Sequence, residues 1–380
     1  MRRWRVRINL IANEANVLHR VGSNQYAFGL IKALADLDKK NDYQVFLSRS
    51  PLADLPKPRR NWWYQVVAPA RLANFWALPR ALPAADVTFV PGHYSPWFCP
   101  KPLVVSIMDL GFLRFPQQFT RPIYWKLKYW TKFSVRQASH ILAISQSTKD
   151  DLVKFYGLPS KKITVTYPGY DQQEARFKRQ DLRGKKIKKK YKIKNDYILF
   201  LSTLKPNKNI EGLLEAFRIL FPRTPRRRAA AHHPRSAGLS LVIAGRQGWL
   251  YERIFAKVKQ LGLADKVIFT DFVPEADVPA LMRGAKAFVL PSFWEGFGIP
   301  VVAAMAIGTP VVVADRGSLP EIVGEAGIIV DPSQPAAIAA GIRQALKDYD
   351  KLSQLGIKQA KKFSWGKCAR ETLTVLEKFV

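Results

Sequence analysis

Cysteine and acidic residues are scarce in this sequence of 380 residues. The two cysteines, Cys99 and Cys368, are too far apart for a metal-binding or redox motif. Their scarcity excludes a disulfide-stabilised scaffold and indicates a reducing compartment. Aspartate and glutamate number 29 against 61 lysines and arginines, so the formal net charge is +32. That charge favours phosphate-bearing partners: nucleic acid, anionic lipid or phosphorylated small molecules.

Long unbroken apolar segments are also missing. After the basic opening of residues 1–16, the apolar run is too short and too polar for a secretory signal, so we expect a first strand there. The longest uncharged stretch, 296–314, contains two Gly/Pro breaks that divide it into loop, short helix, turn and strand. We therefore expect no transmembrane helix at 296–314 and place the protein in the cytoplasm.

Short β-branched runs alternate with helical stretches along the chain, in two series separated by a break. This alternation predicts an α/β protein with parallel sheets and helices on both faces. The hydrophobic content of 48% excludes disorder of the whole chain, and the length fits two domains. We predict doubly wound units at 1–170 and 197–362, joined by a basic linker at 171–196. A C-terminal helix at 363–380 is expected to pack back on the first unit.

Three basic segments carry much of the charge. The linker 171–196 has eleven Lys or Arg against four acids, as a solvated linker or helix face does. Residues 221–238 are basic and rich in Pro and Ala, which indicates a surface insertion. The helical stretch 121–136 has five basic residues, no acid and five aromatics, although the two kinds do not separate cleanly on a helical wheel. It is a candidate for contact with an anionic membrane. We do not expect nucleic acid as a partner, because no nucleic-acid-binding signature accompanies the charge.

The segment 288–327 carries the strongest signal for a binding site. A buried strand leads to a loop in which Gly296 and Gly298 let the backbone pass close to a ligand before a helix begins near Ile299. Free amides at that helix start form a seat for phosphate. Glu295, just before the seat, would repel phosphate but can bind sugar hydroxyls. The arrangement therefore fits a nucleotide sugar, although Glu295 could instead only cap the helix.

Two other acidic patterns have structural interpretations. Ser318 and Glu321 form an S-x-x-E string at a helix start, for which we favour a capping box over ligand contact. Asp36 and Asp38 form an Asp-x-Asp string beside two lysines, and we interpret them as surface charge rather than metal ligands.

Residues 291–324 resemble the signature of the retaining family 4 glycosyltransferases, whose GT-B fold has two Rossmann-like domains facing each other across a cleft. The similarity is to the bacterial mannosyltransferase-like branch of polysaccharide biosynthesis. Further matching segments keep the family's order at 21–26, 106–119, 143–157, 202–217, 244–252 and 363–376.

The resemblance implies transfer of a sugar, with mannose favoured, from a nucleotide diphosphate sugar such as GDP-mannose. It implies no metal ion and no other cofactor, and retention of anomeric configuration. The N-terminal domain would hold a glycan or lipid-linked acceptor, and the C-terminal domain the donor, at the inner face of the cell membrane.

The resemblance also assigns roles to residues. The catalytic groups are Asp109, Lys208 and Glu295. The donor-binding residues are Gly22, Asn207, Lys208, Arg246, Glu295, Gly296, Phe297, Gly298, Ile299 and Ala303. The acceptor-side residues are Tyr26, His93 and Met108.

Four positions depart from the family pattern: Ala303 replaces a second glutamate, Met108 a histidine, Asn207 an arginine, and Ser23-Asn24 follow Gly22 in a turn that usually has a second glycine. A lost ribose hydrogen bond at position 303 would cost about 1 to 3 kcal/mol, which weakens donor binding without abolishing it. His93 is a candidate substitute for the missing imidazole. A second hypothesis therefore stays open, in which the protein binds a nucleotide sugar or glycan without transferring it.

Overall fold

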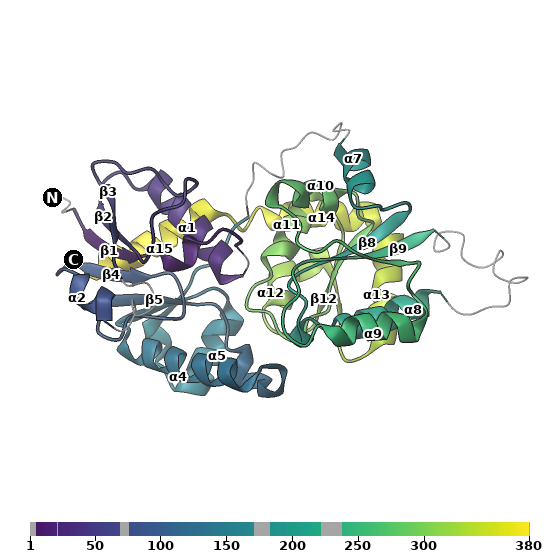
Figure 1. Cartoon of the computed structure of the whole chain (residues 1–380), viewed down its shortest axis with the longest axis horizontal. Coiled ribbons are helices and arrows are strands. Elements are labelled where there is room, and N and C mark those ends of the chain that lie inside the picture. The colour runs from purple at the N-terminus through teal and green to yellow at the C-terminus, as the bar shows by residue number, and fades with distance from the viewer. Residues whose placement is uncertain (1–4, 21, 69–75, 171–182, 222–237, 380) are drawn as a thin grey trace, which may run out of the picture. The chain divides into compact units, whose positions relative to one another are not determined.

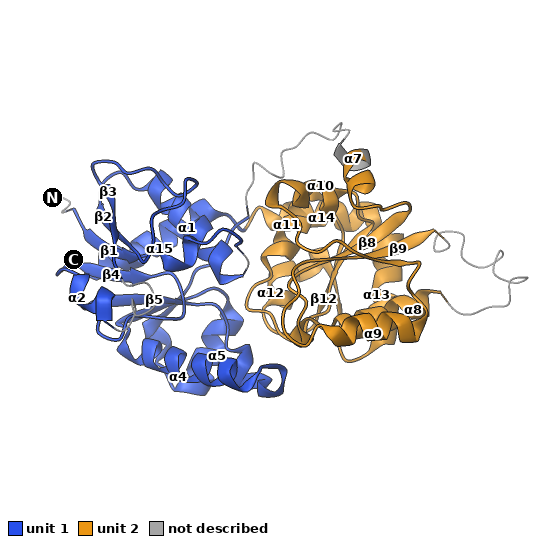
Figure 2. Cartoon of the chain, in the orientation of Figure 1, with its two compact units in different colours: residues 1–170, 363–380 blue, residues 171–362 orange. Residues whose placement is uncertain are grey.

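The computed structural model describes residues 5–20, 22–68, 76–170, 183–221 and 238–379. The chain divides into two compact units (Figure 2). Unit 1 comprises residues 1–170 and 363–380, and unit 2 comprises residues 171–362. Each is a parallel sheet with helices on both faces, so the predicted α/β class with two doubly wound units is confirmed.

The described part of unit 1 contains a seven-stranded parallel sheet in the order β3-β2-β1-β4-β5-β6-β7. The strands are β1 (Arg7–Ile11), β2 (Asp42–Leu47), β3 (Trp62–Val66), β4 (Val87–Val90), β5 (Leu103–Ile107), β6 (His140–Ala143) and β7 (Ile163–Val165). Every residue of β4 and β5 is buried, as expected of central strands covered on both faces.

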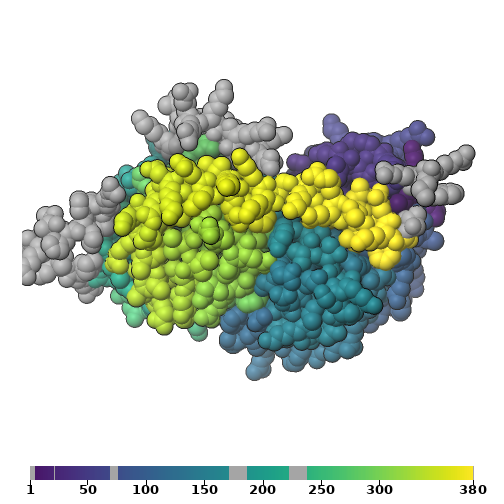
Figure 3. Space-filling view, turned by 180° about the vertical axis from the view of Figure 1, so that it is seen from behind, coloured from purple at the N-terminus to yellow at the C-terminus, as the bar shows by residue number. Residues whose placement is uncertain are grey.

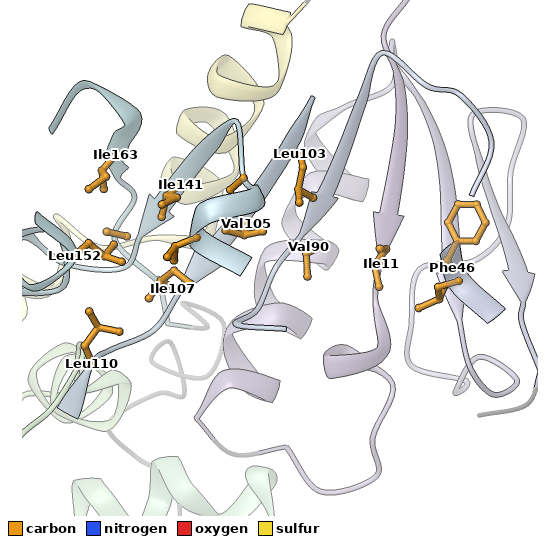
Figure 4. Close-up of a cluster of buried hydrophobic side chains, with 14 of the residues drawn as sticks. Ile11, Phe46, Val90, Leu103, Val105, Ile107, Leu110, Ile141, Leu152 and Ile163 are labelled. Atoms are coloured by element: carbon orange, nitrogen blue, oxygen red, sulfur yellow. The ribbon is translucent and has the colours of Figure 1, made fainter. Parts of the chain in front are cut away.

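Alternate residues of β5 face different helices of unit 1. Val105 and Ile107 join the core cluster in Figure 4, which also includes Val135 of α4 (Arg121–Gln137) and Leu152 of α5 (Gln146–Tyr156). Ser106, between them in the strand, instead accepts a hydrogen bond of 3.1 Å from a tyrosine of α1 (Ser23–Leu37) on the opposite face. Short helices α2 (Leu78–Ala81) and α3 (Gly111–Arg114) complete this unit's described helices before the C-terminal segment.

The C-terminal helix α15 (Trp365–Leu376) belongs to unit 1 and packs on α1. A Cβ at Gly29 of α1 would lie 2.3 Å from Trp365 Cε2, so only glycine lets the two helices approach this closely. Figure 3 shows the last residues of the chain, in yellow, against the surface of this unit. Both faces of the sheet are thereby covered.

The described part of unit 2 contains a six-stranded parallel sheet in the order β10-β9-β8-β11-β12-β13. The strands are β8 (Asp196–Leu201), β9 (Leu239–Ala244), β10 (Val267–Phe269), β11 (Ala287–Leu290), β12 (Val311–Ala314) and β13 (Gly327–Val330). One face carries α8 (Ile210–Leu220), α9 (Glu252–Leu261) and α13 (Pro335–Lys347), and the other α10 (Val278–Arg283), α11 (Ile299–Ile307) and α14 (Tyr349–Ala360) (Figure 1). The short α12 (Leu319–Val323) follows β12.

The uncharged stretch 296–314 is divided as expected, into a loop, α11, a turn at Gly308 and β12. Within the described ranges, no helix has both the length and the apolar character that crossing a bilayer requires. Short 3-10 helices lie at Asn13–Ala15, Pro116–Gln118, Ser160–Lys162, Pro206–Lys208, Glu275–Asp277, Gly324–Ala326 and Glu377–Phe379.

The basic segment 171–196 was expected to be a solvated linker or a helix face, and its described part includes a helix. Its described part forms α7 (Arg183–Lys190), which packs on α10 of unit 2. Lys190 Nζ lies 2.5 Å from Asp277 Oδ2, and Tyr191 donates a 2.7 Å hydrogen bond to the same oxygen. These contacts tie the segment's second half to unit 2. Residues 171–182 and the expected insertion at 222–237 lie outside the described residues.

Candidate active site

The order of strands in unit 2 reverses between β8 and β11. In doubly wound sheets, the carboxyl ends of the strands at such a reversal are where ligands bind. The loop after β8, 202–209, and the loop after β11, 291–298, both start there. Phe293 donates a backbone hydrogen bond of 2.9 Å to the Asn207 carbonyl, which ties the two loops together.

Lys208 and Glu295 form a direct ion pair across these loops. Lys208 Nζ lies 2.6 Å from Glu295 Oε1, and the two side chains are only 14% and 13% exposed. Ser292 donates a further hydrogen bond of 2.7 Å to the same carboxylate oxygen. The two residues expected to act on different parts of the donor are thus in contact, and each neutralises the other's charge.

The loop after β12 holds the backbone of Glu295. The Ser318 amide and hydroxyl both donate to the Glu295 carbonyl, each at 3.1 Å. Gly317 has φ of +64°, and a Cβ there would lie 2.5 Å from the same carbonyl oxygen. Only glycine therefore allows this close approach. Local sequence patterns did not predict this support, although a Gly-Ser pair soon after a buried strand was a signal for it.

Both capping interpretations from the sequence are wrong. The Ser318 side chain makes no capping hydrogen bond at α12, because its hydroxyl is used on Glu295. Glu295 does not cap α11, whose N-cap is Gly298 without a side-chain hydrogen bond. The Glu295 carboxylate bonds Lys208 and Ser292 instead.

The start of α11 presents free backbone amides. Gly298 has φ of +94°, which glycine adopts at little cost. The Val301 and Val302 amides return to the Gly298 carbonyl, and Pro300 has no N–H. Among the described residues, the amides of Gly298 and Ile299 have no hydrogen-bond partner. They lie three and four residues beyond Glu295, at the positive end of the helix dipole.

The other donor-side candidates of unit 2 lie around this point. Arg246 follows β9, and its carbonyl accepts a 2.8 Å hydrogen bond from Leu204 in the loop after β8. Its exposed guanidinium lies 5.4 Å from the Phe272 ring centroid. Asn207 Oδ1 is buried and has no hydrogen-bond partner within the part of the chain that the structure describes. The structure thus gathers Asn207, Lys208, Arg246 and Glu295 at the ends of three adjacent strands.

Phe297 and Ala303 differ in exposure. Phe297 is buried, whereas Ala303 is half-buried on α11, where a longer side chain has room to reach the surface. Gly296 is buried in the loop between Glu295 and Phe297. Gly22 belongs to unit 1, where its φ of +55° starts α1.

In unit 1, His93 supports the turn that carries Asp109. His93 Nε2 accepts a 3.1 Å hydrogen bond from the Met108 amide, and Nδ1 lies 3.4 Å from Thr131 Oγ1. Since Nε2 is an acceptor, the ring is neutral with its proton on Nδ1. Burial lowers the pKa of His93, which the nearby Asp109 only partly offsets. His93 thus positions a turn in the interior and does not replace the missing imidazole at a ligand surface.

Two other acceptor-side candidates are also interior residues. Tyr26 is 1% exposed, and its hydroxyl donates a 3.1 Å hydrogen bond to Ser106. Burial raises the pKa of Tyr26. Met108 is buried as well. Both side chains, predicted on the acceptor side, thus lie in the interior of unit 1. Asp109 is half-buried, and its Oδ1 accepts a 2.8 Å hydrogen bond from the Gly111 amide.

Glu14 and Tyr94 are site candidates that the sequence analysis missed. They follow β1 and β4, the strands between which the order in unit 1 reverses. Asn24 and Ser23 donate to a Glu14 carboxylate oxygen at 2.6 and 3.2 Å, which gives the unusual turn after Gly22 a role. Burial raises the pKa of Glu14. Burial, with the charges of Glu14 and Asp109, raises the pKa of Tyr94 to about 12.

Only one of the two aspartates in the Asp-x-Asp string lies on the surface. Asp36 is exposed, but Asp38 is buried and accepts hydrogen bonds of 2.8 Å from both Asn41 Nδ2 and the Tyr43 hydroxyl. The expectation of surface charge was therefore wrong for Asp38. Within the described residues, no group of three or more His, Cys, Asp or Glu side chains is arranged to hold a metal ion.

Comparisons with known proteins match both units to known families. Residues 21–174 match the family described as Glycosyltransferase Family 4, and residues 183–363 match Glycosyl transferases group 1. The O-antigen chain mannosyltransferase B of Escherichia coli is 30% identical over 321 residues, which cover 82% of this chain and 78% of that protein. Mannosylfructose-phosphate synthase of Agrobacterium fabrum is 30% identical over 64% of this chain, which spans about half (53%) of that enzyme's length.

Solved structures have the same fold. Sucrose-phosphate synthase from Thermosynechococcus elongatus superposes with a TM-score of 0.75 at 17% identity, over 98% of this chain and 99% of that one. Anabaena HepE, in complex with UDP and glucose, has a TM-score of 0.73 at 18% identity, over 98% of this chain and 100% of that one. The fold and the family matches agree along nearly the whole length of the chain. The chain therefore belongs to the family 4 glycosyltransferases of the GT-B fold and is itself a glycosyltransferase.

Proposed function

We propose that the protein transfers mannose from GDP-mannose to a glycan or lipid-linked glycan at the cytoplasmic face of the membrane. The transfer retains anomeric configuration and needs no metal ion. Two relatives support the sugar, the O-antigen chain mannosyltransferases of Escherichia coli and Salmonella typhimurium, at 30% and 26% identity. The observation that carries the proposal is the Lys208–Glu295 pair beside the free amides of α11.

The charges of unit 2 fit a diphosphate attached to a sugar. Lys208 would neutralise the negative charge that develops on the departing diphosphate, helped by the Gly298 and Ile299 amides. Arg246 offers a second, exposed cation at the neighbouring strand end. Glu295 would accept hydrogen bonds from the hydroxyls of the transferred sugar. A bare nucleotide would leave that carboxylate with no such partner.

The charges of unit 1 fit a neutral acceptor. Glu14 and Asp109 put two carboxyl groups near Tyr94 at the strand ends. Carboxylates accept hydrogen bonds from sugar hydroxyls but repel a phosphate. Asp109 would position the attacking hydroxyl, and a glycan terminus would satisfy this site better than a phosphorylated acceptor.

Initial rates of mannose transfer test the proposal. The purified chain is given GDP-mannose and a panel of oligosaccharide acceptors, with UDP-glucose as the competing donor. Lys208→Gln should reduce the rate at least about 100-fold, the usual effect of losing one group that stabilises transition-state charge. Lys205→Gln is the matched control: it removes a charge from the same loop, where Lys205 Nζ lies 4.2 Å from the Trp249 ring centroid. Its rate should stay within about threefold of the unaltered protein.

Two outcomes would contradict the proposal. Equal losses in the Lys208 and Lys205 variants would show that the pair has no special role. Binding of GDP-mannose in calorimetry without transfer to any acceptor would instead support a protein that only binds the donor. The replacements at Met108 and Ala303 motivate that second candidate. Restoring His at position 108 and Glu at position 303 should then raise activity.

A further inference from the structure

A pocket of about 960 Å³ lies in unit 1, between the C-terminal half of α4 and the loop 95–101. Its walls combine two kinds of side chain, aromatic residues and cations. The aromatic ones are Phe98, Tyr129 and Phe133, and the cations are Lys101, Lys132 and Arg136. None of the residues that line it is acidic.

The pocket is separate from the candidate acceptor site. Lys101 comes just before β5, and Arg136 is near the end of α4, which leads to β6. These residues lie toward the amino ends of β5 and β6. Asp109 lies beyond the carboxyl end of β5, so the five residues of that strand separate the two sites. The strand's length of about 16 Å lets both sites be occupied at once.

Hydrogen bonds to α4 fix the start of the loop 95–101, which forms one wall. The Trp130 indole N–H donates to the Ser95 carbonyl at 3.0 Å, and the Ser95 amide donates to the Ser134 hydroxyl at 3.0 Å. Gln137 Nε2 donates to the Ser95 hydroxyl and to the Pro96 carbonyl, both at 3.0 Å. The start of the loop that forms this wall is therefore fixed on α4 without a ligand.

Large aromatic side chains around the pocket face water. Trp97, Phe98, Trp125 and Tyr129 are 50%, 71%, 45% and 61% exposed. Trp125 stacks on Tyr129 with centroids 5.3 Å apart, and Trp97 packs against Phe133 at 5.4 Å. Such exposed apolar groups mark interaction surfaces. Tryptophan and tyrosine beside lysine and arginine are the side chains that favour the interface of a bilayer.

We propose that this pocket binds the head group of an anionic phospholipid in a membrane. Its phosphate lies among Lys101, Lys132 and Arg136, while Trp97, Phe98 and Tyr129 enter the bilayer interface. Charge complementarity supports this occupant, because residues 95–102 and 121–137 contain no acidic residue. A pocket of about 960 Å³ with an aromatic wall is also larger and more apolar than inorganic phosphate requires. This pocket, which rests on the membrane location in the proposed function, would put the membrane contact on a defined surface away from the reacting groups.

Vesicle sedimentation of the full chain tests this site. Vesicles of phosphatidylcholine are compared with vesicles containing one quarter phosphatidylglycerol, at about 0.15 M salt, where exposed charges are screened beyond about 8 Å. The double variant Lys132→Gln/Arg136→Gln should weaken binding to the anionic vesicles at least about tenfold. The matched control, Lys189→Gln/Lys194→Gln, removes the same charge from exposed positions of unit 2 and should change binding less than about threefold. Equal losses of vesicle binding in the two double variants would overturn the proposal and would indicate diffuse attraction by net charge.

Two further measurements test the contribution of the aromatic side chains and the selectivity of the pocket for lipid. Phe98→Ser keeps every charge and should also weaken vesicle binding several-fold, and unchanged binding would refute insertion of the aromatics. Inorganic phosphate at millimolar concentration and a single-stranded oligonucleotide are tested as competitors. If either displaces the protein from vesicles more than addition of salt to equal ionic strength does, the pocket is a general phosphate or nucleic-acid site and the proposal fails.

Transfer to a soluble oligosaccharide separates this proposal from the proposed function. The pocket variants should keep the unaltered rate, since none of these side chains is among the proposed reacting or positioning groups. Circular dichroism and the thermal transition confirm that each variant is folded. If vesicle binding follows the predictions while no sugar is transferred, the site stands and the proposed function fails.

Discussion

Lys208 Nζ and Glu295 Oε1 are 2.6 Å apart, although the two residues are 87 positions apart in the sequence. The pair forms because β8 and β11 are neighbours in the sheet of unit 2. Without a donor the two charges neutralise one another. In the proposed function, a diphosphate would give Lys208 a second anionic partner, and the sugar would give Glu295 neutral ones. Donor binding would therefore redistribute an existing ion pair rather than require a cation that was previously unpaired.

Replacing Glu295 by Gln should separate binding of the nucleotide from transfer of the sugar. The substitution keeps the size of the side chain but removes its charge, which frees Lys208 for the diphosphate. We expect GDP to bind a few-fold to about tenfold more tightly, because repulsion of the phosphates is removed. We expect the transfer rate to fall at least about 100-fold, because the sugar loses its charged acceptor. Calorimetry and initial rates measure the two effects.

Ser292→Ala is the control for this substitution. It removes the 2.7 Å hydrogen bond to Glu295 but leaves the ion pair with Lys208. Transfer should fall only a few-fold. Looser binding of GDP by the Glu295→Gln protein would contradict the assignment of the carboxylate to the sugar.

Placing a glutamate at position 303 should tighten donor binding. Ala303 is half-buried on α11, eight residues after Glu295. In the proposed donor site, a carboxylate there would reach toward the ribose. One added hydrogen bond of about 1 kcal/mol corresponds to roughly a fivefold lower Kd for GDP-mannose. Ala306→Glu, half-buried on the same helix, is the matched control and should leave Kd unchanged. Equal Kd values for the two variants would contradict a ribose site at 303.

Gly298→Ala should destabilise the protein more than an alanine at a left-handed glycine without a close neighbour. Gly298 has φ of +94°, and its Cβ would lie 2.9 Å from Leu319 Cδ2. Gly157 in unit 1 has the same left-handed conformation, with φ of +63°, and no atom lies within 4 Å of the corresponding Cβ. Both alanines have the cost of positive φ, about 1 to 2 kcal/mol, but only Ala at 298 is also crowded. Differential scanning calorimetry should show a Tm several degrees lower for Gly298→Ala, and equal Tm values would refute the crowding.

Burial of neutral His93 should make stability depend on pH. The folded pKa is lowered, so below the unfolded value of about 6.5 the unfolded chain binds a proton that the folded chain does not. The stabilisation is complete above about pH 6.5 and is lost as the pH falls toward the folded pKa, at up to about 1.4 kcal/mol per pH unit. His93→Gln, which can still accept the Met108 N–H, should reduce the fall in Tm between pH 7.5 and 5.5. An unchanged fall would show that other groups control it.

The sequence alone identified the fold class and, in unit 2, the part of the candidate site formed by the loop at Glu295 and the helix start at Gly298. The β-branched runs and amphipathic helices depend on local periodicity, which can be recognised in a single sequence. The loop at Glu295 and the helix start at Gly298 are contiguous, so their geometry also follows from local order. For the same reason the family signature was found there.

Only the tertiary structure decided which side chains meet. Glu295 is held by Lys208 and Ser318, and Glu14 by Asn24, through loops that strand order brings together. It also buried His93, which a linear pattern presents as an ordinary polar loop residue. Local sequence specifies each strand and helix, but the partners of a loop side chain depend on how those elements pack. That packing is determined by burial of the whole apolar surface, and no short segment contains that information.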